Sequence, residues 1–265
     1  METGLSFSVL GAWADRLRPI AEAAGRAILE VRARGFETFT KADTSPVTEA
    51  DRIAEAIVTA EIEQLTPRFP IVAEERMADG LVPVFEGRSF WLVDALDGTK
   101  EFVKRGSDFT VNIALILDGV PVLGIVHAPA LGETYLGVTD SHGANKRAEV
   151  YRDGAVAVIA ARLRPARVIV TGSKSHEVQD QLDQFLAAFD VADRLVVGSS
   201  IKFCMVAEGR ADLYPRFGPT SEWDTAAGHA VLRAAGGRVH TFDGAELTYK
   251  KANYLNGRFL AEGLA

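Results

Sequence analysis

The sequence predicts an α+β protein of two closely packed lobes, and three observations lead to that fold class. The first part opens with helical periodicity and continues with strands joined by tight turns, which is typical of helices on a largely antiparallel sheet. The second part alternates strands with helices, which favours a mixed or parallel sheet. At 265 residues, the chain suits one large domain or two small ones. We place the boundary near residues 150–165, which gives lobes 1–158 and 159–265.

The composition narrows the class of protein. Hydrophobic residues make up 48% and charged residues 25% of the chain, and the formal net charge is −7, which argues against coating of nucleic acid polymers or of membrane surfaces. The apolar runs fall short of the ~20 residues that span a bilayer. With Cys204 as the single cysteine, no intrachain disulfide can form, which suits a reducing compartment. We therefore expect a cytoplasmic monomer or homodimer without stable membrane insertion.

The chain begins with helix signals. Apolar residues recur at helical spacing between Leu10 and Val31, and Pro19 is expected to kink this stretch or divide it into two helices. After a polar loop, Thr48 and Asp51 form a capping-box pattern before a second amphipathic helix. One interpretation is a plain helix start; the other gives Asp43 or Asp51 a place at a metal site.

Strands fill the rest of the first part. A short strand ends at Glu74, and a flexible excursion over 77–89 separates it from a buried strand over 90–93. The Asp118-Gly119 dipeptide predicts a hairpin between strands 108–117 and 120–128. Further strands are expected over 133–138 and, more weakly, to about residue 159.

The second part continues the alternation. Strands are predicted over 167–171, 194–197 and 211–215. Helices are predicted after the turn at 172–176, from the turn at 198–202 through Ala207, and from Ser221 to the Gly236-Gly237 stop signal.

The stretch around Asp94 and Asp97 carries the chemistry. The two aspartates follow the buried strand and precede Gly98 and Thr99, so they group two carboxylates, a backbone carbonyl and a hydroxyl at a strand end, where α/β sheets commonly bind ligands. Grouped carboxylates repel one another unless a cation intervenes, and hard oxygen ligands suit Mg²⁺ or Mn²⁺. The alternative is a surface Asp-Gly turn that closes a hairpin.

Two more acidic residues could join this site. Glu74 ends the neighbouring predicted strand, and Asp224 opens a helix in the second lobe. An acidic residue at a helix start is often a cap, but across an interlobe cleft Asp224 would supply a further carboxylate. Cys204, within an apolar helix, is expected to be a small buried hydrophobe. The histidines lack zinc-protease spacing, and no P-loop or dinucleotide-binding glycine pattern occurs.

Several separate motifs resemble one known family. The run Trp91–Thr99 closely resembles the first signature of the inositol monophosphatase superfamily, Trp223–Gly228 resembles its second signature, and Glu74 sits where that family has a metal-binding glutamate. The match spans essentially the whole chain. Four further stretches resemble the 3'(2'),5'-bisphosphate nucleotidase, CysQ-type branch: 41–48, 97–102, 198–204 and 213–219. Ala95 departs from the family, which usually has proline there.

The resemblance implies a layered αβαβα fold and a Mg²⁺-dependent phosphomonoesterase with two or three ions, Mn²⁺ being a possible substitute. By position, the implied metal ligands are Glu74, Asp94, the Leu96 carbonyl, Asp97 and Asp224, with Asp43 on a weaker ion. The implied catalytic residues are Asp51 and Thr99, which orient the attacking water, together with Glu74. Sensitivity to Li⁺ is implied as well.

The implied substrate is a small phosphorylated molecule, adenosine 3',5'-bisphosphate, which would lose its 3'-phosphate to give AMP. A second phosphate needs extra cations, and arginine suits phosphate. The expected substrate contacts are Gly98, Thr99, Lys100, His176, Ser199, Lys202, Arg216 and Asp224. Two alternatives stay open: a phosphatase of the same fold acting on inositol monophosphate or another sugar phosphate, and a non-catalytic binding protein.

Overall fold

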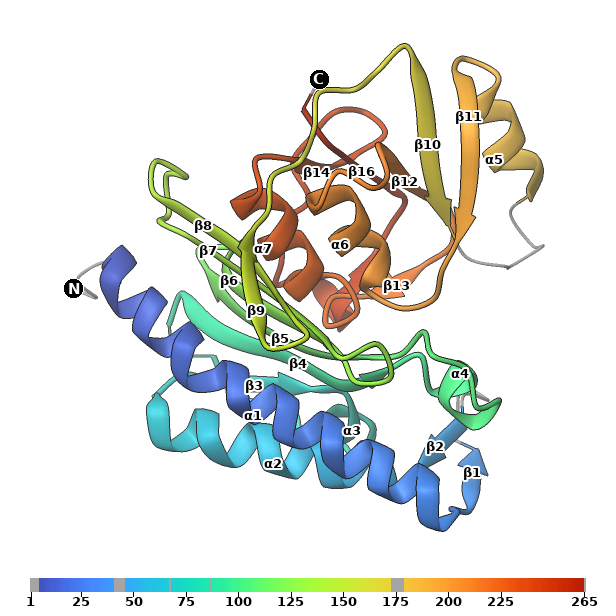
Figure 1. Cartoon of the computed structure of the whole chain (residues 1–265). Coiled ribbons are helices and arrows are strands. Elements are labelled where there is room, and N and C mark those ends of the chain that lie inside the picture. The colour runs from blue at the N-terminus through green and yellow to red at the C-terminus, as the bar shows by residue number, and fades with distance from the viewer. Residues whose placement is uncertain (1–4, 41–45, 67, 86, 173–178, 265) are drawn as a thin grey trace.

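Two β-sheets alternate with three layers of helix, in the order helix, sheet, helix, sheet, helix (Figure 1). The computed structural model describes residues 5–40, 46–66, 68–85, 87–172 and 179–264. The predicted α+β, five-layered architecture is thereby confirmed. Within the described ranges, no helix combines the length and apolarity that crossing a membrane requires.

The first sheet has seven strands in chain order, with β3 parallel to β4 and all other neighbours antiparallel. The predicted hairpin is present, and both Asp118 (φ 54°) and Gly119 (φ 78°) adopt the left-handed conformation that a tight hairpin turn needs. The strands are β3 (Ile71–Ala73), β4 (Ser89–Asp97), β5 (Thr110–Leu117), β6 (Val120–Ala128), β7 (Glu133–Thr139), β8 (Lys146–Arg152) and β9 (Ala155–Val158).

Helices α1 (Phe7–Arg34) and α2 (Glu49–Leu65) cover the outer face of this sheet (Figure 1). A kink or a division was expected at Pro19; the division is wrong, because α1 runs unbroken past it, and the kink stays a prediction. Pro19 lies on the exposed side, while Leu17 and Ala21 on either side of it are buried. Burial of this apolar stripe holds the helix together and offsets the ~3 kcal/mol that an interior proline costs.

Helices α6 (Ile201–Ala207) and α7 (Ala226–Ala234) fill the layer between the sheets (Figure 1). Helix α7 lies directly on the sheet backbone, since a Cβ on Gly124 would be 2.3 Å from the Ala227 carbonyl oxygen and one on Gly137 would be 2.4 Å from Val231 Cα. These two glycines permit the close approach. The helix begins at Ala226 rather than at the predicted Ser221, so Asp224 lies in the preceding loop.

The second sheet has the order β11-β10-β12-β16-β14 and is mixed, which is one of the two predicted arrangements. Its strands are β10 (Arg167–Gly172), β11 (Asp190–Val196), β12 (Leu213–Arg216), β14 (Arg238–Thr241) and β16 (Phe259–Glu262). Helix α5 (Gln179–Leu186) covers its outer face (Figure 1). Strand β11 starts at Asp190, before the predicted residue 194. The prediction missed this start because the first residues of the strand are polar and mostly exposed and carry no strand periodicity.

Short elements complete the chain. Strand β1 (Thr38–Thr40) pairs with β2 (Pro46–Thr48), and β13 (Thr220–Ser221) pairs with β15 (Leu255–Asn256). Helix α3 (Glu74–Ala78) follows β3, helix α4 (Thr99–Val103) follows β4, and η2 (Ala252–Tyr254) precedes β15. All strands of the large sheets fall on the expected sides of the predicted 158/159 boundary, which itself stays a prediction.

Candidate active site

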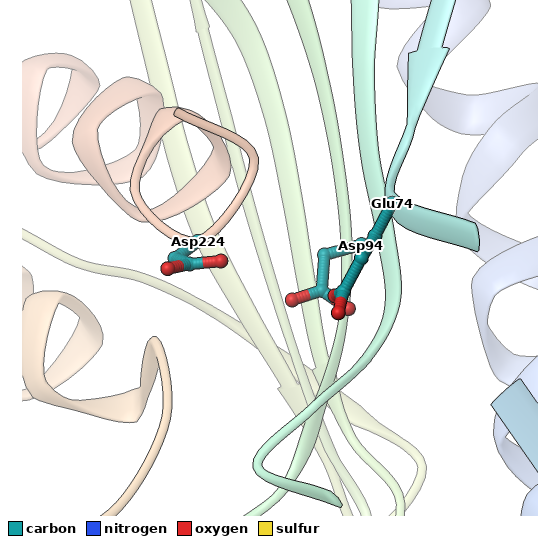
Figure 2. A group of neighbouring side chains, drawn as sticks. All are labelled: Glu74, Asp94 and Asp224. Carbon is teal, nitrogen blue, oxygen red and sulfur yellow. The ribbon is translucent and has the colours of Figure 1, made fainter. Parts of the chain in front are cut away.

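Three carboxylates meet where the two halves of the chain face each other. Glu74 begins α3, Asp94 lies in β4 and Asp224 precedes α7, and each offers an oxygen within 4.8 Å of the others. Figure 2 shows Glu74 and Asp94 together on one side, with Asp224 reaching toward them from the opposite side. The cluster lines a cavity of about 310 Å³, whose wall also includes Leu96, Asp97, Gly98, Thr99 and Lys100.

Strand pairing places the first-lobe carboxylates. Because β3 runs parallel to β4 with Ala73 opposite Val93, the residues that follow these two in the chain, Glu74 at the start of α3 and Asp94 in β4, come side by side. Asp94 pairs with Asn112 and Asp97 with Thr110, so β4 has an extra residue relative to β5. This bulge resets the alternation of side chains, and both aspartates line the same cavity despite their odd spacing.

Burial and mutual repulsion both disfavour the charged forms of these carboxylates. Burial, followed by repulsion from Glu74, Asp97 and Asp224, raises the pKa of Asp94 well above its usual range. Removal from water and the charges of Asp97 and Glu74 likewise raise the pKa of Asp224. An all-oxygen set of this kind fits a hard divalent cation, which would relieve the repulsion.

Asp51 and Thr99 form a second pair beside the cluster. The Thr99 hydroxyl lies 3.1 Å from Asp51 Oδ1 and 3.1 Å from the Leu96 carbonyl oxygen, either of which it can donate to. Asp51 Oδ2 accepts from the backbone amide and the hydroxyl of Thr48, both at 2.8 Å, so the predicted capping box is confirmed. Asp51 is buried, and this burial raises its pKa.

The turn at Gly98 presents Thr99 to the cavity. Gly98 has φ 92°, and a Cβ there would lie 2.8 Å from the Asp108 carbonyl oxygen, so only glycine fits. Lys100, next along, is exposed at the rim.

The loop before α6 reaches the cluster through Ser200, a residue that the sequence analysis missed. Its hydroxyl lies 2.7 Å from the Asp224 carbonyl oxygen and 3.2 Å from Asp97 Oδ2, and it accepts from Asn112 Nδ2 at 2.9 Å. Ser200 thus joins β4, β5 and the Asp224 loop. The Gly-Ser-Ser turn was the available signal, but it did not distinguish Ser200 from Ser199.

Lys202 lies beneath the loop that precedes α6. Its side chain is buried, and its ammonium donates to the carbonyl oxygens of Ser199 (2.6 Å) and Val197 (3.3 Å). Burial lowers its pKa to about 8, against the opposing effect of Asp97. Lys202 therefore supports the loop that carries Ser199, and these two hydrogen bonds leave one of its three N–H donors for a further acceptor.

The remaining predicted contacts are distributed as follows. Arg216 ends β12, and its guanidinium donates to the carbonyl oxygens of Gly218 and Pro219, each at 3.2 Å. Asp43 and His176 lie outside the described residues. Cys204 is buried, as expected.

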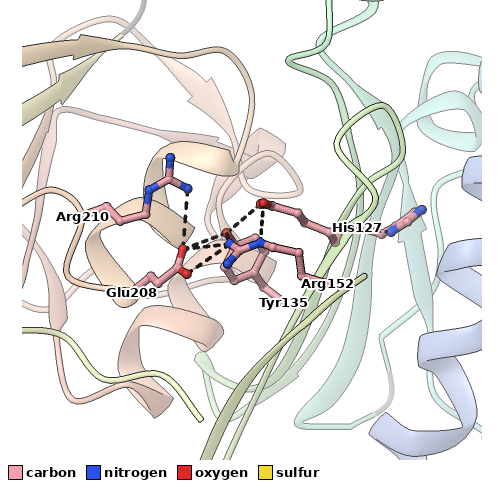
Figure 3. A network of polar contacts seen from close by, with 6 residues as sticks. His127, Tyr135, Arg152, Glu208 and Arg210 are labelled. Carbon is pink, nitrogen blue, oxygen red and sulfur yellow. Dashed lines mark hydrogen bonds and ion pairs between the residues drawn. The ribbon is translucent and has the colours of Figure 1, made fainter. Parts of the chain in front are cut away.

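The far end of α6 is anchored to the first sheet. Glu208, which follows the helix, accepts from the Tyr135 hydroxyl at 3.0 Å and from the Arg152 guanidinium at 3.1 Å (Figure 3). Arg152 also binds Glu133 at 2.6 Å, and Arg210 approaches Glu208 at 3.6 Å. The helix is thus held at both ends, with Ser200 at one and this interlobe network at the other.

Comparison with known proteins decides the family. A model of the inositol monophosphatase family matches residues 13–265. The chain belongs to this family. Among curated proteins of the family, it is 44% identical to the 3'(2'),5'-bisphosphate nucleotidase CysQ of Salmonella typhimurium and 42% identical to that of Escherichia coli K12, each over 92% of this chain and 97% of the relative.

Solved structures of family members agree with the fold. CysQ from Bacteroides thetaiotaomicron superposes with a TM-score of 0.77 at 34% identity, covering 96% of this chain and 98% of the other. An inositol monophosphatase from Anabaena gives a TM-score of 0.74 at 24% identity, covering 96% and 92% of the two chains. The inositol monophosphatase fold predicted from the motifs is therefore confirmed.

Proposed function

We propose that this chain is a divalent-cation-dependent phosphomonoesterase acting on 3'(2'),5'-bisphosphate nucleotides, converting adenosine 3',5'-bisphosphate to AMP and phosphate. The observation that carries the proposal is the 42–44% identity to CysQ nucleotidases over 92% of the chain. The assembled carboxylate cluster supports it, because a degenerate, non-catalytic relative would be expected to have lost some of these residues.

The cation-binding residues are Glu74, Asp94, Asp97 and Asp224, with the Leu96 carbonyl. They would hold Mg²⁺ or Mn²⁺, two or three ions in all, with Asp43 serving a weaker one. When bound, such a cation polarises the phosphate and lowers the pKa of a coordinated water. Oxygen ligands that converge on one cavity favour this assignment over zinc.

Thr99 and Asp51 orient the attacking water. When the Thr99 hydroxyl donates to Asp51, its oxygen remains an acceptor toward the cavity that Thr99 lines. Thr48 fixes the other Asp51 oxygen, so the pair is preorganised before substrate binds. A water that donates to Thr99 is then held in place for in-line attack on phosphorus, and positioning of this kind supplies much of the rate enhancement.

Among the proposed substrate contacts, Gly98, Thr99 and Lys100 line this cavity. The backbone amides of Gly98 and Thr99 would hold the reacting phosphate, as successive N–H groups in a turn do. Lys100 and Arg216 are the proposed cations for the second phosphate, with Lys202 beneath the loop and His176 beyond the described residues. Within the described part of the chain, the buried Ser199 hydroxyl lacks a hydrogen-bond partner, which makes it a candidate substrate donor.

The test is phosphate release from adenosine 3',5'-bisphosphate and from inositol 1-phosphate, measured side by side with Mg²⁺ and with a chelator. The expected result is strong, Mg²⁺-dependent preference for the nucleotide. Preference for the inositol phosphate would refute the nucleotide assignment while leaving the phosphatase chemistry. Absence of release from both would refute the catalytic proposal.

A further inference from the structure

A second buried carboxylate lies one turn beyond Asp51 on α2. Glu55 is only 5% exposed. Its Oε2 accepts from the Glu75 backbone amide at 2.8 Å, and its Oε1 accepts from the Arg76 amide at 3.0 Å. A buried carboxylate is costly unless it is hydrogen-bonded, so both of its oxygens are committed to these two amides.

These amides belong to the first turn of α3, which lacks a cap of its own. The N-cap residue is Ala73, and its methyl group cannot accept a hydrogen bond. The second and third amides of a helix are the donors that an N-cap side chain normally satisfies. Glu55 takes over this role from a neighbouring helix, with one oxygen for each amide.

The first residue of the same turn is Glu74, a member of the carboxylate cluster. Helix α3 is tied to α2 at two further points, because the Arg76 guanidinium donates to the Thr59 hydroxyl and to the Glu63 carboxylate, both at 2.8 Å. The backbone that carries Glu74 is therefore fixed relative to the helix that carries Asp51.

We infer that Glu55 is a positioning residue for the cation site, which it serves by capping the turn that presents Glu74. The inference rests on the proposed function, in which Glu74 is a ligand. Glu55 itself does not touch the cation, since its two oxygens face the amides of Glu75 and Arg76.

The test is Glu55→Gln, which keeps the side-chain size but replaces one acceptor with an amide that cannot accept. Mn²⁺ binding, followed by electron paramagnetic resonance without substrate, is expected to weaken about 10- to 100-fold, as it does when residues that orient metal ligands are altered. In phosphate release, the Mg²⁺ concentration for half-maximal rate should rise by a similar factor. The rate at saturating Mg²⁺ should stay near that of the unaltered protein, because at high cation concentration the site is filled and Glu74 is held in its ligand position by the bound ion.

Two variants separate positioning from general stability. Leu186→Val trims a buried residue of α5, which packs on the outer face of the second sheet, and should lower the melting temperature with unchanged Mn²⁺ affinity. Ala73→Ser, added to Glu55→Gln, gives α3 a cap of its own and should restore much of the lost affinity.

Unchanged Mn²⁺ affinity in folded Glu55→Gln would overturn the inference. If that variant does not fold, Glu55→Asp, one methylene shorter and still charged, takes its place under the same criterion. Mn²⁺ binding is measured without turnover, so failure of the unaltered protein to release phosphate would refute the proposed function separately.

Discussion

Replacement of Asp94 by asparagine should make the cation-free protein more stable while abolishing its response to Mg²⁺. Asp94 lies in the cluster in which carboxylate oxygens come within 4.8 Å of one another. Its Oδ1 accepts from the Leu96 amide at 3.0 Å, and the asparagine oxygen can keep that bond. Asp94→Asn therefore removes a charge with little change in volume or local hydrogen bonding.

The magnitude follows from Coulomb's law. Two unit charges 4.8 Å apart repel by about 3.5 kcal/mol at an effective dielectric constant of about 20. Partial protonation, which the raised pKa of Asp94 indicates, reduces the repulsion that is actually present. We expect the free energy of unfolding to rise by about 1–3 kcal/mol near pH 8 in the presence of a chelator.

The pH dependence has a definite sign. The pKa of Asp94 in the folded protein is raised above 3.8, its ordinary value. At a pH between the ordinary pKa and the raised pKa, the folded protein therefore binds more protons than the unfolded chain. This group's contribution to stability therefore falls as pH rises through that window. The gain from Asp94→Asn should be largest at high pH and should vanish toward about pH 4.

The assay is urea unfolding with a chelator and with Mg²⁺. At about 100 times its dissociation constant, a bound ion adds about 2.7 kcal/mol to the unfolding free energy, and Asp94→Asn should lose this increment and nearly all phosphate release.

Asp140→Asn is the matched control. Asp140 accepts three backbone amides, which lower its pKa to about 2, so loss of its charge should destabilise the protein. A chelated Asp94→Asn protein less stable than the unaltered one near pH 8 would refute the electrostatic reasoning.

Three further predictions concern other parts of the structure. Thr99→Val removes the hydroxyl beside Asp51 and should lower kcat about 10²- to 10⁴-fold with Mn²⁺ affinity retained; normal turnover at saturating substrate would contradict its role. Burial lowers the pKa of His229 to about 3 in the folded protein. As pH falls below about 6.5, the unfolded chain therefore protonates at this histidine before the folded protein does. The free energy of unfolding then decreases by at most ~1.4 kcal/mol per pH unit. In urea titrations between about pH 6.5 and 4.5, His229→Gln should flatten this dependence, and an unchanged slope would count against it. Glu208→Gln weakens the network with Tyr135 and should lower the unfolding free energy by about 1–3 kcal/mol, seen as a lower melting temperature with turnover preserved; an unchanged melting temperature would show that the network adds no stability.

Local patterns predicted much of the fold, because most elements carry their own signals. The hairpin at Asp118-Gly119 and the capping box at Thr48 depend on residues within a few positions of each other, and both are present. The division at Pro19 was predicted wrongly because the helix is stabilised by burial against the sheet. This is a tertiary effect, which the helix propensity of single residues does not include. The true start of strand β11 was not predicted, because an exposed edge strand lacks the apolar alternation on which the prediction depends.

The site was predictable where residue chemistry alone identifies it. Glu74, Asp94 and Asp224 stand out as acidic residues at element ends, and the structure brings them together. Ser200 and Asn112 were not identified, because the hydrogen bond between them joins residues 88 positions apart and the bond from Ser200 to Asp97 joins residues 103 positions apart. Nor could the sequence reveal the bulge in β4, since it is defined by the pairing register with β5.

Helix α2 explains how distant motifs keep a common geometry. Asp51, Glu55, Thr59 and Glu63 follow one another at intervals of four residues, so they share one side of the helix. Asp51 meets Thr99 of the signature motif, and the other three hold the backbone and the arginine of α3. Another side of the same helix carries Ala54, Val58 and Ile62, which are fully buried and pack in the core. Because the helix is rigid, packing of these apolar residues sets the distance between the Thr99–Asp51 pair and the Glu74 carboxylate. A core substitution that shifts α2 should therefore alter catalysis and cation affinity together, whereas a change at Thr99 alters catalysis alone.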